Sequence, residues 1–162
     1  MRLTGVGEVV IRASDAADFR QVLALLTGAG LPTEDLDTAP ELRFWVAEDE
    51  GKIVGAVGLE RTGTAGLLRS LVVAPGYRAK GLGRELVATL ERNAEADGVE
   101  ILVLLTQTAE SFFGGLGYRL VDRAYVPDET KQSAEFRSLC PASARCLTKS
   151  IPSRVQRPII GG

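Results

Sequence analysis

The alternation of apolar and polar positions predicts a chain that begins with strand, helix and then three strands. Residues 8–14, EVVIRAS, alternate and are rich in β-branched side chains, which is typical of a strand. A helix over about 16–30 follows, with apolar residues at helical spacing. The segment 42–60 predicts two strands joined by a DEGK turn, and a third strand follows at about 66–74. Three successive strands indicate an antiparallel meander.

The second half of the chain predicts a crossover helix and a buried strand. A helix over about 81–97 gathers its apolar residues on one stripe. The continuous apolar run at 99–107, VEILVLLTQ, is typical of a central strand covered on both faces. A helix between two such strands makes them parallel, through a right-handed crossover. A short helix at 109–116 and strands at 118–126 and 143–151 complete the expected order.

Length, charge and cysteine count limit the class of protein. The 162 residues favour a single domain, which we assign to 1–151, followed by a loosely attached tail over 152–162. A net charge of -2 without a basic cluster argues against a nucleic-acid partner. No apolar run is long enough for a signal peptide or a membrane-spanning helix. Together with only two cysteines, this favours a cytoplasmic protein with no membrane partner.

The sequence contains no histidine, which excludes several kinds of chemistry. Ser-His-Asp and Cys-His nucleophile systems need histidine, and so do the common zinc sites. Proton transfer must therefore use carboxylates, Tyr, Cys, Lys, the backbone or water. We expect no metal site.

The most informative segment is RSLVVAPGYRAKGLGRELVATL, at 69–90, where a strand meets a basic, glycine-rich turn that opens a helix. A helix N-terminus carries unpaired N–H groups and a partial positive charge, so it can bind a phosphate. Gly81 and Gly83 would let the backbone approach such an anion without a Cβ in the way. The alternative is an ordinary turn whose glycines only end the strand and whose basic residues are solvated.

This turn resembles the acetyl-CoA-binding motif of the GNAT acyltransferase superfamily, [Q/R]-x-x-G-x-[G/A]. The matching residues are Arg78, Ala79, Lys80, Gly81, Leu82 and Gly83, and Arg84 follows in the first helical turn. The resemblance covers about residues 8–149, including the order of elements. It implies an α+β fold of α/β/α layers. The central sheet would be mixed and mostly antiparallel, with about six or seven strands, a V-shaped splay and flanking helices.

The resemblance also implies a cosubstrate and the way in which it is held. The cosubstrate would be acetyl-CoA, with its pyrophosphate on the glycine-rich turn. The backbone of Leu71, Val72 and Val73 would hydrogen-bond the pantetheine arm like an added strand. The thioester would then lie where the fourth and fifth strands diverge, and an N–H near Val73 would polarise its carbonyl.

A narrower resemblance concerns GLPTEDLD, LLRSLVVAP, LTQTAESFFGGLGYR and, most distinctively, AEFRSLCPASARCL. These segments are similar to the N-acetyltransferases encoded in bacterial arsenic-resistance operons. The resemblance implies direct acetyl transfer to the amine of a small molecule, linked to resistance to arsenic or toxic compounds, and does not identify the acceptor. Proteins of the superfamily often form homodimers, but no stretch of this sequence specifies an interface.

Two other functions are weighed against this one. A CoA-binding regulatory or structural module without turnover is favoured by the missing histidine and by Phe113. At that position the superfamily often has a Tyr that acts as the acid. The position lies five residues before the aromatic residue of the pair Gly117-Tyr118. An acetyltransferase for proteins would need an open acceptor groove, whereas the polar segment 127–142 resembles a lid.

Phe113 cannot donate a proton to the departing thiolate. Either the thiolate leaves unaided, which a thiol pKa of roughly 8.5 permits, or Ser111 or Thr106 supplies the proton. We expect Phe113 to pack beside the pantetheine arm and Phe112 to lie in the core. Two carboxylates are candidates for the base that takes a proton from the amine, Glu60 at a strand end and Glu34 in a loop. For both, the alternative is a solvated surface charge.

Arg69 interrupts an apolar run. A charge inside a central strand costs free energy unless it is paired with an opposite charge or solvated. It would either anchor an anionic group of the acceptor, together with Arg123, or form a structural salt bridge. Cys140 is a candidate for the acceptor pocket. The alternative for Cys140 and Cys146 is that both are small buried hydrophobes, which we prefer to a metalloid site.

Overall fold

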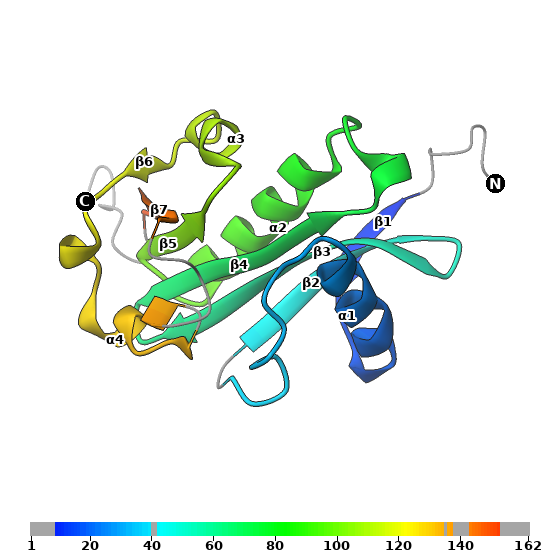
Figure 1. Ribbon diagram of the computed structural model, residues 1–162, viewed down its shortest axis with the longest axis horizontal. Coiled ribbons are helices and arrows are strands. Elements are labelled where there is room, and N and C mark those ends of the chain that lie inside the picture. The colour runs from blue at the N-terminus through cyan, green and yellow to red at the C-terminus, as the bar shows by residue number, and fades with distance from the viewer. Residues whose placement is uncertain (1–8, 40–41, 135, 138–142, 153–162) are drawn as a thin grey trace, which may run out of the picture.

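A mixed sheet of seven strands forms the centre of the structure, a computed structural model that describes residues 9–39, 42–134, 136–137 and 143–152 (Figure 1). The strands in their spatial order are β1 (Val10–Ala13), β2 (Leu42–Asp49), β3 (Lys52–Thr62), β4 (Ala65–Val73), β5 (Ile101–Thr106), β7 (Arg145–Ser150) and β6 (Arg119–Leu120). The first four form the expected antiparallel meander, and β4 and β5 pair in parallel. The fold expected from the sequence is thereby confirmed.

Helices cover both faces of this sheet, as the layered fold requires. Figure 1 shows α1 in front of the sheet and α2 behind it. The helical elements in chain order are η1 (Ala16–Asp18), α1 (Phe19–Gly28), η2 (Pro75–Tyr77), α2 (Leu82–Ala96), α3 (Glu110–Gly114), η3 (Arg123–Tyr125) and α4 (Asp128–Lys131). Within the described parts of the chain, no helix has both the length and the apolar character needed to cross a membrane.

Three apolar clusters hold the layers together. The predicted stripe of α2, including Leu86 and Leu90, packs behind the sheet and is fully buried. Val22 and Leu26 of α1 pack in front. A third cluster around Leu67 joins β4 and β5 to the segment near α4. Burial of one such leucine contributes about 1.5–3 kcal/mol to stability, so these clusters fix the position of the sheet against both layers.

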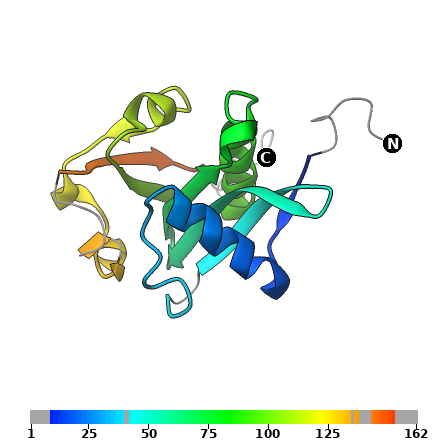
Figure 2. The same ribbon diagram turned by 45° about the vertical axis from the view of Figure 1, so that its right-hand side comes forward.

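Strands β4 and β5 separate after a short paired region. Their ladder runs only from Ala65 to Leu67 on β4, whereas β5 continues alongside β7 as far as Thr106. Beyond that point a bulge interrupts the β3–β4 ladder between Arg69 and Val72, and Ser70 adopts a φ of 61° there. Figure 2 shows β5 and β7 turning away from the meander. The sheet therefore has the expected splay, with one edge of β4 left open.

The predicted strand over 118–126 is wrong for most of its length. Only Arg119 and Leu120 pair, with β7, before η3 begins. The Asp122 side chain accepts a hydrogen bond from the Ala124 N–H, at 2.8 Å, and so caps η3. This local cap turns the chain out of the sheet. The last strand, β7, enters instead between β5 and β6, an order that the sequence pattern does not predict.

Candidate active site

The open edge of β4 and the start of α2 line one cavity of about 600 Å³, here named the splay cavity. Its lining residues are Leu71, Val72, Val73, Tyr77, Arg78, Ala79, Gly81, Leu82, Gly83, Arg84, Ala109 and Phe112. Nine of the eleven residues predicted to hold a cofactor are in this set. The two exceptions are Lys80, which is exposed, and Phe113.

The turn before α2 has the backbone geometry of an anion-binding loop. Gly81 is the N-cap at a φ of 83°, and no side chain hydrogen-bonds the first N–H groups of the helix. Ala79 is also left-handed, at a φ of 65°, which costs a residue with a Cβ about 1–2 kcal/mol. Gly81, Leu82 and Gly83 line the splay cavity, and no side chain caps the first N–H groups of α2 there.

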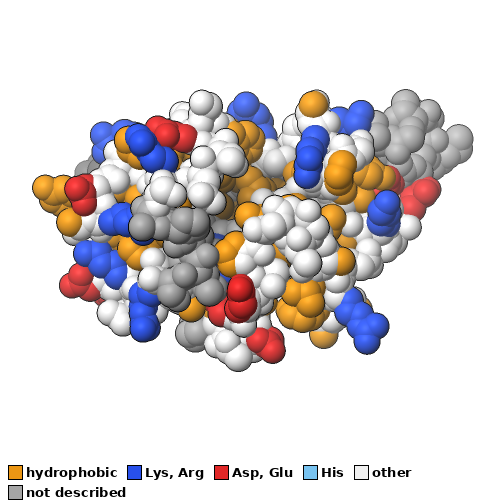
Figure 3. Space-filling model, viewed as in Figure 1, with side chains coloured by type: hydrophobic (Ala, Val, Ile, Leu, Met, Phe, Trp, Pro, Cys, Tyr) orange, Lys and Arg blue, Asp and Glu red, His pale blue; other side chains and the backbone are white. Residues whose placement is uncertain are grey.

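Basic side chains surround the mouth of the splay cavity. Arg78 and Arg84 line it and are exposed. The Arg78 Nε donates to the Val73 carbonyl oxygen at 3.0 Å, which ties the turn to the end of β4. On the face shown in Figure 3, basic side chains gather along the upper edge, above the loop that leads into α2. Acidic side chains gather on the opposite edge, over the loop between α1 and β2.

The two adjacent phenylalanines of α3 have exchanged their expected places. Phe112 lines the splay cavity and is 37% exposed, whereas Phe113 is 4% exposed within the core. Phe113 packs edge-on against both Phe112 and Tyr118, with ring centroids 5.1 and 5.4 Å apart. The structure therefore places Phe113 in the core and Phe112 on the wall of the splay cavity, the reverse of the placement expected from the sequence.

Arg69 is fully buried and lies in a network of ion pairs. Its guanidinium donates to both oxygens of Asp35, at 2.7 and 2.8 Å, and to the Glu60 Oε1 at 3.2 Å. The Arg69 side chain has 0% exposure, so it cannot also anchor an anionic group of an acceptor. The structural salt bridge, the alternative reading of the sequence, is the one that forms. Hydrogen bonding from Arg69 lowers the pKa of Asp35 below its ordinary value.

Glu60 lies between this network and a second cavity. Its Oε1 also accepts from the Ser133 Oγ at 3.0 Å, and its side chain is only 4% exposed. This second cavity, named the acidic cavity, has a volume of about 240 Å³. It is lined by Asp35, Thr38, Ala39, Glu60, Thr62, Glu129, Gln132, Ser133 and Ala134. Glu60 is therefore a buried, oriented carboxylate rather than a solvated one.

The remaining candidate residues lie elsewhere. Glu34 is exposed and accepts from the Thr33 N–H, while its neighbour Asp35 points inward. Ser111 is exposed on α3 and lines neither the splay cavity nor the acidic cavity. Arg123 donates to the Ala144 carbonyl oxygen at 2.8 Å and stacks over the Phe136 ring. Cys140 lies outside the described residues.

Cys146 and Tyr118 are held in their neutral forms. Burial raises the pKa of the Cys146 thiol, which is 3% exposed in an apolar cluster. The small buried hydrophobe is therefore the reading that fits Cys146. Burial also raises the pKa of Tyr118, whose hydroxyl donates to Glu91 at 2.8 Å. In the described ranges, no group of three or more Cys, Asp or Glu side chains is arranged to hold a metal ion.

Sequence reasoning missed three lining residues of the splay cavity and two members of the network around Arg69. Tyr77, Ala109 and Phe112 line the splay cavity, and Asp35 and Ser133 complete the network around Arg69. One available signal was Arg69 itself, because a buried arginine requires a carboxylate partner. Asp35 lies directly after Glu34, which the sequence had offered as a candidate base. Nothing in the local pattern pointed to Ser133.

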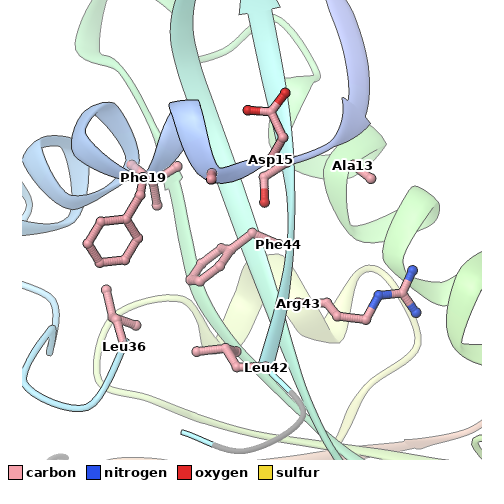
Figure 4. A pocket seen from close by; sticks show the side chains of 10 residues that line it. Ala13, Asp15, Phe19, Leu36, Leu42, Arg43 and Phe44 are labelled. Atoms are coloured by element: carbon pink, nitrogen blue, oxygen red, sulfur yellow. The ribbon is translucent and has the colours of Figure 1, made fainter. Parts of the chain in front are cut away.

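A third cavity is separate from both sites. This aromatic groove, of about 310 Å³, lies between the start of α1 and the start of β2 (Figure 4). Phe19, Phe44, Leu36 and Leu42 point toward one another there, with Asp15 and Arg43 at the edge. Neither of these two charged side chains points toward the centre of the groove.

The open, splayed sheet, with a glycine-rich helix start at the split, defines the fold class of the CoA-dependent acyltransferases. Comparison with known proteins agrees: a family model described as Acetyltransferase (GNAT) domain matches residues 40–120. The chain belongs to this family.

Among curated proteins, the chain is similar to probable N-acetyltransferase 14 of Danio rerio, with 42% identity over 99 residues. It is also 30% identical over 104 residues to an uncharacterized N-acetyltransferase of Chlorobaculum tepidum. These matches cover 56% and 64% of this chain, but only 35% and 64% of the two relatives.

Solved structures share the fold at lower identity. A Mycobacterium tuberculosis protein in complex with CoA and NLQ has a TM-score of 0.74 at 22% identity, covering 88% of this chain and 99% of that one. N-acetylglutamate synthase of Neisseria gonorrhoeae, complexed with CoA and N-acetyl-glutamate, has a TM-score of 0.76 at 21% identity. That match covers 90% of this chain and 36% of the synthase.

Proposed function

We propose that the protein is an N-acetyltransferase that moves an acetyl group directly from acetyl-CoA to the amine of a small molecule. The observation that carries this proposal is the splay cavity. An open strand edge at Leu71–Val73 and an uncapped helix start at Gly81 line the same cavity of about 600 Å³. Such a cavity suits a molecule with a peptide-like arm and a pyrophosphate, which is the chemistry of acyl-CoA.

Each part of the splay cavity has a separate task in this proposal. The edge of β4 hydrogen-bonds the pantetheine arm, and the N–H groups at the start of α2 bind the pyrophosphate. Arg78 and Arg84 add positive charge beside it. Phe112 packs along the arm. Acetyl-CoA supplies the activated acetyl group as a thioester, and the chain orients its carbonyl and polarises it through a backbone N–H near Val73.

Glu60 is the residue that we propose as the base. Arg69 and Ser133 fix its Oε1, which leaves the Oε2 to take the proton of the attacking amine through a chain of waters. No acid for the thiolate is assigned. Ser111 is exposed away from the cavity, and the Tyr118 hydroxyl is bound to Glu91. The thiolate then leaves unaided, which its pKa of roughly 8.5 allows.

The narrower link, to resistance against arsenic or toxic compounds, is also a proposal. It rests on the resemblance of four sequence segments, one of which overlaps residues outside the described ranges. A strain that lacks the gene should grow less well on an amine-bearing arsenical, and the gene should restore growth. Equal growth of both strains would contradict this link and leave the enzymatic proposal intact.

Calorimetric titration with acetyl-CoA tests the proposed site. We expect micromolar binding by the wild type and at least a thirtyfold loss in Gly81→Glu. That variant places a negative charge and a strained residue, at a φ of 83°, beside the pyrophosphate. Gly98→Glu is a matched control. It has the same charge, a φ of 85° and open space around it, at the other end of α2, about 22 Å away.

Two outcomes would contradict the proposal. Absent binding by the wild type would reject the cofactor site, and undiminished binding by a folded Gly81→Glu protein would reject the role of the turn. A CoA-binding module without turnover is distinguished by thiol release with a panel of amines. Such a module would bind acetyl-CoA and release no thiol above the rate without amine.

A further inference from the structure

A buried carboxylate of the β2–β3 hairpin has no part in the chemistry proposed above. Asp49 is the last residue of β2, it is 9% exposed, and it lines neither the splay cavity nor the acidic cavity. A carboxylate removed from water costs free energy unless it is hydrogen-bonded. The Tyr77 hydroxyl donates to the Asp49 Oδ2. Because Tyr77 lines the splay cavity, this hydrogen bond joins the hairpin to the wall of the cofactor site.

The hairpin is a firm support for this bond. Glu50 and Gly51 form a two-residue turn in which both have positive φ, 51° and 83°, the conformation that fits the twist of a β-hairpin. Just beyond it, the Ile53 N–H donates to the Gln21 Oε1 of α1 at 2.9 Å. Asp49 is therefore held by its own turn and, through the next strand, by the helix in front of the sheet.

The segment that Tyr77 leads into is the basic turn, defined as residues 78–81. All four of these residues are exposed. Ala79 and Gly81 are left-handed, and for Ala79 such a conformation persists only where the surrounding structure imposes it. At the far end of the basic turn, Leu82 is 8% exposed and packs in the core. The basic turn therefore depends on how firmly its two ends, Tyr77 and Leu82, are fixed.

Another hydrogen bond holds the same turn but is solvent-exposed. The Arg78 Nε donates to the Val73 carbonyl oxygen at 3.0 Å, and the Arg78 side chain is exposed. Water competes for such a bond, so its net contribution is small. The bond between Tyr77 and Asp49 joins a half-buried ring to a buried carboxylate, and hydrogen bonds to carboxylates are stronger than those between neutral groups.

We propose that Tyr77 and Asp49 are positioning residues for the basic turn. Their hydrogen bond holds the turn in the conformation that receives the pyrophosphate of acetyl-CoA. A turn already held in its binding conformation loses less conformational entropy when the ligand binds, and this raises affinity. The inference rests on the proposed acetyltransferase function and adds to it a determinant of affinity for the nucleotide half of the cosubstrate.

Two thioesters that differ in the nucleotide half test the inference. Acetyl-CoA carries the pyrophosphate, whereas S-acetylpantetheine ends before it. We expect the ratio of the Kd of S-acetylpantetheine to the Kd of acetyl-CoA, measured by calorimetry, to fall about tenfold in Tyr77→Phe. A hydrogen bond that served only the stability of the fold would not change this ratio.

Tyr118→Phe is the matched control. It also removes a buried hydroxyl that donates to a carboxylate, that of Glu91 at 2.8 Å, but Tyr118 does not line the splay cavity. Its ratio should remain within twofold of the wild-type value. Equal ratios in Tyr77→Phe, Tyr118→Phe and the wild type would overturn the inference.

A double-mutant cycle assigns the effect to the pair. Asp49→Ala should weaken acetyl-CoA binding about as much as Tyr77→Phe does, and the double variant should lose no more than either single one. Losses that multiply in the double variant would mean that the two residues act separately, and would overturn the inference.

A measurement without ligand separates this inference from the proposed function. We expect backbone order parameters from 15N relaxation to be about 0.85 over residues 78–81 in the wild type, and to fall below about 0.6 in Tyr77→Phe and Asp49→Ala. They should stay at the wild-type value in Tyr118→Phe. Unchanged order parameters in both turn variants would overturn the inference. Failure of acetyl-CoA to bind the wild type is the distinct result that rejects the proposed function.

Discussion

The splay cavity and the acidic cavity share no lining residue and are built from different parts of the chain. The splay cavity is mainly backbone: an open strand edge, a left-handed turn and an uncapped helix start. The acidic cavity is built of side chains, whose positions depend on the ion pairs of Arg69. A backbone site is set by local conformation, whereas a side-chain site requires partners from distant segments. The two sites should therefore fail in different ways when they are mutated.

The largest expected effect is on the side-chain site. Arg69→Met leaves Asp35 and Glu60 buried without their cation, and we expect a loss of about 3–5 kcal/mol in the free energy of unfolding. Arg43→Met is the control, since Arg43 makes an ion pair with Asp97 at 2.6 Å but is 50% exposed. It should cost at most about 1 kcal/mol. Urea unfolding measures both, and equal losses would contradict the distinction.

Alanine substitutions of Phe113 and Phe112 on α3 compare a core position with a position in the splay cavity. Phe113→Ala should lower the free energy of unfolding by about 3–5 kcal/mol, because it empties a packed position next to Tyr118. Phe112→Ala should cost about 1 kcal/mol or less and weaken acetyl-CoA binding several-fold. Unfolding and calorimetry on the same pair measure this. The reverse pattern would restore the placement expected from the sequence.

Acid should weaken the acidic cavity's network through Asp35. The pKa of Asp35 is lowered from 3.8 by the Arg69 hydrogen bonds, so its stabilisation is fully present above that value and is lost as the pH falls through the lower folded value. The stability difference between wild type and Asp35→Asn should therefore be smaller at pH 3 than at pH 6, by on the order of 1 kcal/mol.

The exposed Asp37 on the same loop provides the control, as Asp37→Asn should show no such change. Urea unfolding at the two pH values is the measurement. A pH-independent difference for Asp35→Asn would mean that the Asp35 carboxylate contributes nothing through its ion pair.

The smallest effect should come from Gly83→Ala at the start of α2. A Cβ there would meet the Phe112 ring at 3.4 Å, an ordinary contact with a movable side chain. Alanine also favours helix over glycine by up to about 1 kcal/mol. We expect unchanged or slightly raised stability and at most a threefold weaker acetyl-CoA affinity, measured by unfolding and calorimetry. A loss as large as that in Gly81→Glu would show that close backbone approach is needed at both glycines.

The sequence by itself determined the parts whose physics is local. The alternation in β1 to β3, the apolar stripe of α2 and the glycine-rich turn each depend on residues a few positions apart, and they occur where expected. Nine residues predicted to hold a cofactor share the splay cavity for this reason, because a strand, a turn and a helix start are consecutive in the chain.

Only the tertiary structure decided the rest. Asp35 is separated from Arg69 by 34 residues, and no local pattern distinguishes it from exposed Glu34. The five-residue α3 is too short for a periodicity to show which phenylalanine faces the core. The local sequence likewise does not determine that β7 pairs between β5 and β6, because every open strand edge offers similar backbone hydrogen-bonding groups. In each case the outcome is set by packing between distant segments, which the sequence pattern does not contain.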